Sequence, residues 1–451
     1  MAKSEAGDGR EQAFRILLRV ETSGAFASIL LDRLPEKALD PRDLRLATEL
    51  VFGTLRWQAR LDHCLQQISS RPLNELHPAV RVGLRLACHQ ILNLDRIPDP
   101  AAVNGSVLLV RRAAGEPGAR FTNGVLRSLC RRAGEISFPP PDSPDPADWP
   151  AIHSHPSWMI ERWIGRWGKA ETRALLEADN RPAPLALRLQ KPAAGTDQLA
   201  ARLKSEGVET VPSAVLPSVL RVVRGNPFRT RAFSEGWFYA QDEASQIVPQ
   251  LLGEPIAGPV LDMCAAPGGK AIRIASGGAD PPLVIAADRH LGRLERLREN
   301  RDRLGLANLL PLGADFSRGS PLSARFPAVI LDAPCSGTGT LRRHPEIRWR
   351  LKPGDLWRLG VIQKDLLDTA ARHVAADGVL VYSVCSLEEE EGRCRVETFL
   401  GQHADFRLGD ARKFLPESIH SCATEGPFLA TFPHREGMDG FFAARLERRP
   451  G

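Results

Sequence analysis

The sequence has no long apolar run and is poor in cysteine, lysine and tyrosine. Its eight cysteines are too few for a disulfide framework in 451 residues, and none stand at the C-x-x-C spacing of a zinc or redox site. We therefore expect free thiols and no bound metal. The first twenty residues carry charges throughout, unlike a signal peptide, and no later segment reaches membrane-spanning length. These absences predict a cytoplasmic protein that does not contact a membrane.

The composition is that of a globular protein with a contact to a polyanion. A hydrophobic fraction of 43% in a chain this long can bury a substantial core, divided between two and four domains. The net charge is +6, and residues 1–135 hold 20 Lys and Arg against 15 Asp and Glu. This excess of positive charge favours a polyanion partner for the N-terminal third.

Hydrophobic periodicity divides the chain into four parts. Residues 1–135 have apolar side chains at the three and four residue spacing of helices, and 136–150 is a linker rich in proline and aspartate. Residues 151–235 form a small α/β unit, with helices at 158–167 and 197–205 and strands at 185–189 and 219–223. Residues 236–451 alternate strands and helices, which predicts a doubly wound sheet. Its predicted strands include 260–261, 283–287, 309–312, 328–331 and 379–383.

The first strand of the last part ends in the segment DMCAAPGGK at 262–270, followed by a helical stretch. Small residues at the carboxyl end of a strand in an open α/β sheet let the backbone approach a ligand closely. The segment is neither a Walker A loop nor a G-x-G-x-x-G fingerprint, because Lys270 is not followed by Ser or Thr and the glycine spacing differs. Asp288 and Asp315 end the next two strands, where a carboxylate can accept from ribose or adenine. With Asp262, they indicate S-adenosyl-L-methionine as the cofactor.

Two cysteines stand at the ends of the fourth and fifth predicted strands, Cys335 in DAPCSG and Cys385 in YSVCS. The topology makes those strands neighbours, so we expect both thiols on the cofactor edge. Carbon 5 of cytosine is a poor nucleophile, but a thiolate that adds to carbon 6 converts the ring to an enamine that can accept a methyl group. Asp332 is close enough to Cys335 to support the addition at N3 and the exocyclic amine.

The local sequence favours Cys385 as the nucleophile. Ser386 and Glu389 have capping-box spacing, which predicts a helix just after Cys385, and a helix N-terminus lowers the pKa of a cysteine. The carboxylates of 388–391 act in the opposite direction. Cys264, in the cofactor loop, is predicted to be a packing residue. The same prediction of a small buried hydrophobe covers Cys64, Cys88, Cys130, Cys394 and Cys422.

An arginine-rich segment follows Cys335. The target atom is inaccessible in a stacked helix, so the base must be unpaired or splayed out. The segment 341–350, LRRHPEIRWR, combines four arginines with a tryptophan and a histidine, which can hold phosphates and stack on a base. The RNA-binding residues predicted from it are Arg342, Arg343, Arg348 and Trp349.

With these residues in view, the chain resembles the bacterial RNA cytosine-C5 methyltransferases of the NOL1/NOP2/Sun family, and among them the Sun, or RsmB, type. The shared motifs are LDMCAAPGGK, AADRH, GADFS, LDAPCSGTGTLRRHPEIRW, YSVCSLEEEEG and DGFFAARL. The N-terminal region is similar to the NusB-like RNA-binding domain of the Sun type, through RDLRLATELVFGTLRW, ILNLDRIPDPAAVNG and FTNGVLR. The resemblance covers nearly the whole chain, including QDEASQ at 241–246.

The resemblance implies an all-α NusB-like domain at 1–135, a small ferredoxin-like α/β subdomain at 151–235 and a Rossmann-like class I methyltransferase domain at 236–451. It also implies that Cys385 attacks the base and that Cys335 assists release of the product. One departure from the family pattern is Val384, where threonine is usual. The residues implied to line the cofactor site are Cys264, Ala265, Ala266, Pro267, Gly268, Gly269, Lys270, Asp288, Asp315 and Asp332.

Three alternative functions use the same residues differently. A DNA cytosine-C5 methyltransferase would attack with Cys335 and would not need Cys385. A tRNA cytosine-C5 methyltransferase is compatible with the catalytic motifs. A non-catalytic RNA-binding ribosome-assembly factor could retain the fold, but the intact cofactor loop and both thiols argue against it. By analogy, the NusB-like domain favours small-subunit (16S) ribosomal RNA as the substrate of a monomeric enzyme.

Overall fold

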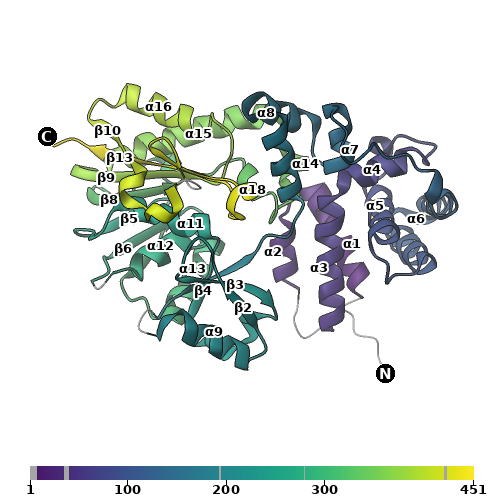
Figure 1. Cartoon of the computed structure of the whole chain (residues 1–451), viewed down its shortest axis with the longest axis horizontal. Coiled ribbons are helices and arrows are strands. Elements are labelled where there is room, and N and C mark those ends of the chain that lie inside the picture. Colours follow the sequence, from purple (N-terminus) through teal and green to yellow (C-terminus); the bar gives the residue numbers. More distant parts are fainter. Residues whose placement is uncertain (1–7, 35–39, 192–193, 279, 421–423, 451) are drawn as a thin grey trace. The chain divides into compact units, whose positions relative to one another are not determined.

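The structure is a computed structural model of the chain. The residues that it describes are 8–34, 40–191, 194–278, 280–420 and 424–450. The chain forms two compact units, shown in Figure 1, and each is described by itself. Unit 1 is Met1–Arg181 with Leu341–Leu351, and unit 2 is Pro182–Thr340 with Lys352–Gly451. Within the described ranges, no helix combines the length and the apolar character needed to cross a membrane.

Unit 1 is built from helices whose apolar stripes face a common core, as the sequence spacing predicts. In α1 (Gly9–Ser23), the Asp8 side chain accepts from the Glu11 N–H at the start, and Gly24 ends the helix with a left-handed φ of 65°. The other helices are α2 (Ala27–Asp32), α3 (Pro41–Arg56), α4 (Gln58–Gln66), α5 (Pro78–Asn93), α6 (Asp99–Arg132), α7 (Trp149–His153), α8 (Ser157–Asp179) and α14 (Ile347–Arg350).

The proline-rich segment 136–150, predicted to be a linker, is packed into unit 1. It contains the short 3-10 helix η3 (Pro146–Asp148) and leads directly into α7. The Trp149 indole is only 1% exposed and donates to Ser143 O at 3.1 Å. The prolines do not prevent these short helices, because proline is tolerated in the first turn of a helix. Burial of the Trp149 indole then holds the segment against unit 1. The first segment of unit 1 therefore includes 136–150 and runs on to Arg181.

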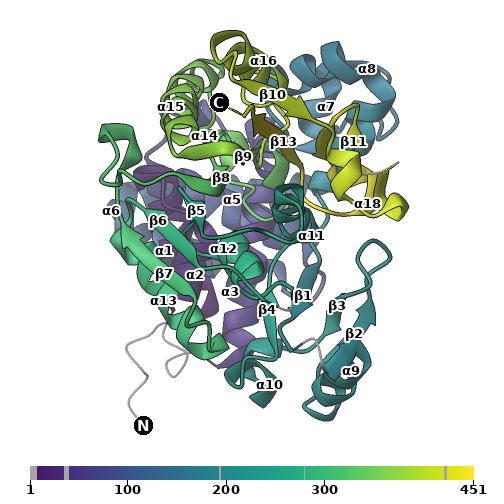
Figure 2. The same cartoon turned by 90° about the vertical axis from the view of Figure 1, so that its left-hand side faces the viewer.

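A small antiparallel sheet begins unit 2, and Figure 2 shows it with α9 beside it. The strand order is β2-β3-β1-β4, which is the ferredoxin-like arrangement that the family resemblance implies. Leu187, Leu199 and Phe238 form the core between the sheet and α9. The elements are β1 (Leu185–Leu189), α9 (Gly195–Ser205), β2 (Glu209–Pro212), β3 (Val219–Arg224), α10 (Arg231–Ser234) and β4 (Phe238–Ala240).

The large sheet of unit 2 has the strand order β11-β12-β13-β9-β8-β5-β6-β7, and β10 pairs with β13. All five predicted strands are present and pair in parallel, while β13 runs antiparallel to β9. The strands are β5 (Val260–Asp262), β6 (Val284–Asp288), β7 (Leu309–Gly313), β8 (Phe326–Asp332), β9 (Val374–Val384), β10 (Phe406–Gly409), β11 (Thr424–Glu425), β12 (Phe428–Thr431) and β13 (Phe441–Arg448).

Helices cover both faces of the large sheet (Figure 1). Val260 and Ile330 point to the face of α11, α12 and α13, whereas Leu261 and Leu331 point to the face of α15 and α16. Strands buried on both faces read as continuous apolar runs, which explains why the sequence revealed them. The helices are α11 (Glu243–Ile247), α12 (Gly269–Ala275), α13 (Leu291–Leu304), α15 (Pro353–Arg372), α16 (Arg393–Gln402) and α18 (Pro433–Glu436).

Parallel pairing brings the carboxyl ends of the central strands to one edge of the sheet. Asp332 stands opposite Ser383 in the pairing of β8 with β9, and Asp262 stands opposite Ile330 in the pairing of β5 with β8. The loops that follow these strands carry the chemical groups singled out in the sequence. This edge is therefore where a functional site is expected.

Candidate active site

Two glycines in the loop after β5 lie directly against side chains of neighbouring segments. Gly268 has a left-handed φ of 113°, and a Cβ there would lie 3.0 Å from Leu297 Cγ. A Cβ on Gly269 would lie 3.0 Å from Gln241 Nε2. Glycine is thus required both by the backbone conformation and by the close approach of α13 and of the segment before α11.

The buried Lys270 and the half-buried Asp332 form an ion pair at this edge. Lys270 Nζ lies 2.6 Å from Asp332 Oδ2, and the Ser383 hydroxyl donates to Asp332 Oδ1 at 2.8 Å. The ammonium group also lies 4.9 Å from the centre of the Phe441 ring. Three strands and the cofactor loop therefore fix the orientation of the Asp332 carboxylate, three residues before Cys335.

The other two strand-end carboxylates have local partners. Asp288 accepts from Ala266 N–H at 3.2 Å and from His290 N–H at 2.8 Å, so it ties the cofactor loop to the end of β6. Asp315 accepts from the N–H and the hydroxyl of Ser317, and these hydrogen bonds lower its pKa. This turn contact accounts for Asp315 locally, and its cofactor role stays a prediction.

The surroundings of Asp262 indicate a bound ligand more clearly than those of Asp288 or Asp315. Its side chain is 0% exposed, and among the described residues neither oxygen has a partner at regular hydrogen-bond geometry, although the backbone of Cys264 lies near enough to lower its pKa slightly. Burial, followed by the charge of Asp332, raises the pKa of Asp262 to about 8. A buried carboxyl normally has a hydrogen-bond partner, and a ligand with amino or hydroxyl donors would supply one. The residues at this edge thus fit a nucleoside cofactor.

The raised pKa of Asp262 makes the stability of the ligand-free protein depend on pH. Unfolded aspartate has a pKa of about 3.9, so between about pH 4 and 8 the folded state holds a proton that the unfolded state has released. Stability is therefore lost as the pH rises through this window, by up to about 1.4 kcal/mol per pH unit. Urea unfolding at several pH values should show this slope in the wild type and a shallower one in Asp262→Asn. The exposed control Asp302→Asn should keep the wild-type slope, and equal slopes in all three proteins would contradict the prediction.

The two predicted thiols meet at the same edge. Cys335 follows β8 and Cys385 follows β9, and their Sγ atoms lie 3.3 Å apart. The hydrogen bond with Cys385 and burial raise the pKa of Cys335 well above its usual value. Burial also raises the pKa of Cys264, and this sulfur packs against one of the two sheet cores. The geometry thus separates one close thiol pair from a third, packed cysteine.

The helix predicted to begin just after Cys385 is absent, because α16 begins only at Arg393. The Ser386 hydroxyl accepts from Glu388 N–H but donates to Glu391 instead of starting a helix. Burial raises the pKa of Glu391. The prediction that a helix N-terminus activates Cys385 was therefore wrong.

The remaining cysteines divide into three groups. Cys64 and Cys88 are buried as predicted, with Sγ atoms 3.8 Å apart, and Cys130 is half-buried. Cys394 is exposed, which corrects the prediction that it packs in the core. It lies near the start of α16, whose apolar residues Val396 and Phe399 face inward on another side. Cys422 lies outside the described residues.

Arg348, predicted to bind RNA, is instead a buried residue of unit 1. Its guanidinium is 0% exposed, and Nη1 donates to Ser154 O at 3.0 Å and to Asn180 Oδ1 at 2.9 Å. Nη2 donates to Asp179 O at 3.2 Å. Burial lowers its pKa to about 10, so the group stays charged at neutral pH. The prediction was wrong for this residue, because its partners are carbonyl groups far away in the sequence.

The rest of the arginine-rich segment is held in unit 1 in the same way. Trp349 Nε1 donates to Leu55 O at 2.6 Å, and Glu346 accepts from Ala27 N–H at 2.9 Å. Arg342 is buried and Arg343 is half-buried. RNA binding by Arg342, Arg343 and Trp349 stays a prediction.

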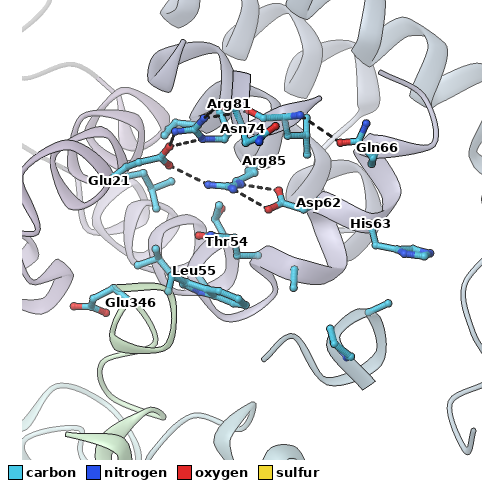
Figure 3. Close-up of a pocket in the computed structure, with 18 of the residues that line it drawn as sticks. Glu21, Thr54, Leu55, Asp62, His63, Gln66, Asn74, Arg81, Arg85 and Glu346 are labelled. Carbon is cyan, nitrogen blue, oxygen red and sulfur yellow. Dashed lines mark hydrogen bonds and ion pairs between the residues drawn. The ribbon is translucent and has the colours of Figure 1, made fainter. Parts of the chain in front are cut away.

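A cavity of about 920 Å³ lies within unit 1 (Figure 3). Arg85 donates to both oxygens of Asp62 at 2.7 Å and to Glu21 at 3.0 Å, and Arg81 also donates to Glu21. The charges on its wall therefore neutralise one another, and none of the described residues that line it is a cysteine. This network holds α1, α4 and α5 together and supplies no nucleophile.

Sequence reasoning missed the polar residues that surround the thiols. Ser336, Ser386 and Gln363 are buried and converge on the Glu391 carboxylate. The available signal was the run of four glutamates, in which one glutamate is fully buried. The sequence alone does not distinguish that member from its neighbours.

Three family models match consecutive parts of the chain. The model described as NusB family matches residues 8–131, and a model of an RsmF/B-like ferredoxin-like domain matches 155–229. The model described as 16S rRNA methyltransferase RsmB/F matches 253–447. The second match begins at residue 155, just before α8, whereas unit 2 begins at Pro182, so the family model and the compact units divide this region at different residues.

Relatives match over the whole length. A Synechocystis protein (strain PCC 6803), described as a probable ribosomal RNA small subunit methyltransferase B, is 34% identical over 97% of this chain and 99% of its own. A Bacillus subtilis (strain 168) protein with the same description is 31% identical over 98% of both chains.

Two solved structures share the fold. The crystal structure of PH0851 covers 99% of this chain and 100% of its own, with a TM-score of 0.82 at 24% identity. The structure of NSun6 from Pyrococcus horikoshii with SFG covers 66% of this chain and 100% of its own, with a TM-score of 0.59 at 20% identity. The full-length relatives, together with the family models, show that the chain belongs to the RsmB/F family of 16S rRNA methyltransferases.

Proposed function

We propose that this protein methylates carbon 5 of a cytosine in small-subunit (16S) ribosomal RNA, through a covalent adduct between a thiol and carbon 6. The observation that carries the proposal is the pair of thiols 3.3 Å apart at the edge where the cofactor loop ends. Methylation of a nitrogen or of a ribose hydroxyl needs no thiol, whereas methylation of an unactivated pyrimidine carbon does.

Cys385 is the proposed nucleophile. Its thiolate adds to carbon 6, and the electron pair of the 5,6 double bond moves toward carbon 5. Asp332, fixed by Lys270 and Ser383, is oriented to contact N3 and the exocyclic amine of the base. When bound, S-adenosylmethionine, the methyl donor of this family, supplies the electrophilic methyl group that carbon 5 takes up. Loss of the carbon 5 proton then re-forms the double bond and expels the Cys385 thiolate.

Cys335 is the proposed acceptor of that proton. Its pKa is raised chiefly by the hydrogen bond with Cys385, so in the free enzyme it is held as a thiol. Once Cys385 has become a thioether, its contribution to the pKa disappears, while burial and the charges of Glu391 and Asp332 still raise it. Cys335 then releases its proton to water, and the resulting thiolate takes the proton from carbon 5. The two thiols thus act in sequence: attack by Cys385 changes the protonation of Cys335.

The cofactor would be held by the loop after β5 and by the strand-end carboxylates. Gly268 and Gly269 let the loop pack closely against Leu297 and Gln241, and Asp262 offers a buried carboxyl group that lacks a regular hydrogen-bond partner among the described residues. Asp288 is already tied to the loop through Ala266, so it would fix the position of the loop as well as contact the ligand.

The choice of ribosomal RNA rests on the relatives. Those with full-length matches are described as small subunit ribosomal RNA methyltransferases, and residues 8–131 match the NusB family. The net positive charge of residues 1–135 suits an RNA partner. The tRNA alternative shares the catalytic edge and differs only in what unit 1 would bind.

Bisulfite sequencing of ribosomal and transfer RNA tests this proposal in a strain that lacks the protein. We expect one 5-methylcytosine to disappear from small-subunit ribosomal RNA. The wild-type gene should restore it, and a gene encoding Cys385→Ala should not. Loss of the mark from a tRNA instead would replace the substrate, and an unchanged pattern in both RNAs would reject the function.

A further inference from the structure

Glu391 is a fully buried carboxylate between the two thiol-bearing loops. It lies in the turn between β9 and α16 and is 0% exposed. Oε1 accepts from Ser336 N–H and from Gln363 Nε2, each at 2.9 Å. Oε2 accepts from the hydroxyls of Ser336 and Ser386. These four donors match the acceptor capacity of an ionised carboxylate.

The two serines connect Glu391 to the thiols through the backbone. Ser336 directly follows Cys335, and Ser386 directly follows Cys385. The serine hydroxyls also lie 3.0 Å from each other. One carboxylate thus binds the residue next to each sulfur, on loops whose residues are about fifty positions apart in the sequence.

The carboxylate is itself held from the other side. Gln363 Nε2, on α15, also donates to Pro334 O at 3.0 Å, and the Tyr382 hydroxyl donates to Glu391 O at 2.6 Å. Glu391 is therefore fixed both by its backbone and by its side chain. A rigid anchor of this kind determines the separation of the groups bound to it.

We propose that Glu391 is a positioning residue that sets the distance between the Cys335 and Cys385 thiols by clamping Ser336 and Ser386 together. The proposal concerns the reaction described under the proposed function and rests on it for the catalytic consequence. The hydrogen bonds described for Glu391 go to Ser336, Ser386, Gln363 and Tyr382 and not to the cofactor loop, so we expect it to act through the loops that carry the two cysteines.

Two substitutions separate the clamp from the charge. In Glu391→Gln, Oε1 still accepts from the Ser336 N–H and Gln363, and the amide can donate to both serine hydroxyls, so the geometry is kept without the charge. In Glu391→Ala, all four donors lose their acceptor, and the loops are joined only by their direct contacts, such as the one between the two serine hydroxyls. Glu391→Gln should therefore rescue what Glu391→Ala loses.

The distance between the thiols can be measured without substrate. Phenylarsine oxide binds two adjacent thiols at once, forming two As–S bonds with loss of water. Digestion and mass spectrometry of the full-length protein then identify which cysteines are bridged. This step is needed because Cys64 and Cys88 form a second close pair, which is fully buried in the folded protein. The matched control is Glu389→Ala, an exposed neighbour in the same glutamate run.

We expect Glu391→Ala to lose most of the Cys335–Cys385 bridge and to lower kcat about 100-fold with little change in KM for RNA. Glu391→Gln should keep the bridge and stay within about threefold of wild-type kcat. A bridge that persists in Glu391→Ala at wild-type yield, or is lost in Glu391→Gln with the fold intact by circular dichroism, overturns the clamp. If the wild type forms the bridge but makes no 5-methylcytosine, the proposed function fails while the clamp stands.

Discussion

We expect Cys385→Ala to transfer methyl groups to RNA at a rate lower by on the order of 10³-fold or more. Without its thiol no adduct forms at carbon 6, and carbon 5 stays a poor nucleophile. Cys335→Ala should behave differently, because attack by Cys385 is still available. It should form the adduct and then release the product slowly, because the base that takes the carbon 5 proton is missing.

The measurement combines methyl incorporation into a ribosomal RNA transcript with denaturing gel electrophoresis. Cys335→Ala should give a band of protein joined to RNA that survives denaturation, and Cys385→Ala should give none. The double variant serves as the control, and it too should form no adduct. RNA that contains 5-azacytosine should trap the wild type through Cys385 in the same assay.

The opposite pattern would reverse the roles of the thiols. An adduct that persists in Cys385→Ala and is lost in Cys335→Ala would make Cys335 the nucleophile, as in the DNA-type alternative. The two Sγ atoms are only 3.3 Å apart, so either sulfur can reach the same base, and geometry alone does not choose between them. The family resemblance assigns the attack to Cys385, and the raised pKa of Cys335, which keeps that sulfur protonated, agrees with this assignment.

Arg348→Ala should destabilise unit 1 by about 3–5 kcal/mol. The buried guanidinium serves carbonyls of two segments and lies near the buried carboxylate of Asp179, whose charge favours its ionised form. Its removal leaves those carbonyls without their donor and Asp179 without this opposing charge. Arg348→Lys should recover only part of the loss, because one ammonium group cannot replace a planar fork.

Thermal unfolding of the full-length protein, followed by hydrogen exchange in α7 and α8, measures this effect. Arg120→Ala is the matched control, because Arg120 is 80% exposed and its ion pair with Glu116 is worth less than about 1 kcal/mol. A variant at position 348 with wild-type stability but weaker RNA binding would restore the original interpretation of this residue as an RNA contact.

Most of the fold could be predicted from the sequence because its signals are local. The runs at 185–189 and 260–261 are apolar over the length of a strand, and both are strands in the structure. The position of β13 beside β9 was not predicted, because no feature of 441–448 specifies its partner. The antiparallel pairing of β13 thus depends on contacts between residues far apart in the sequence.

Some site residues could be predicted because their chemistry depends on the residue type at the end of a strand. Cys335, Cys385 and Asp332 lie together, as neighbouring parallel strands require. The helix after Cys385 was not predictable, because Ser386 binds a buried carboxylate five residues away that also binds Ser336. A capping-box pattern considers only hydrogen bonds between residues three positions apart. Here the Ser386 hydroxyl binds Glu391 instead, and no helix starts.

Unit 1 is built from two separate segments of the chain, and this affects how it folds during synthesis. Its last eleven residues, Leu341–Leu351, come after the larger part of unit 2, Pro182–Thr340, in the sequence. During synthesis, the N-terminal helices emerge from the ribosome long before α14 exists, so until then Arg348 cannot cap the carbonyls at Ser154 and Asp179. In a fragment that ends at Arg181, these carbonyls would lack the Arg348 donor permanently. The natural boundary between the domains is therefore not a place where the gene can be divided without loss.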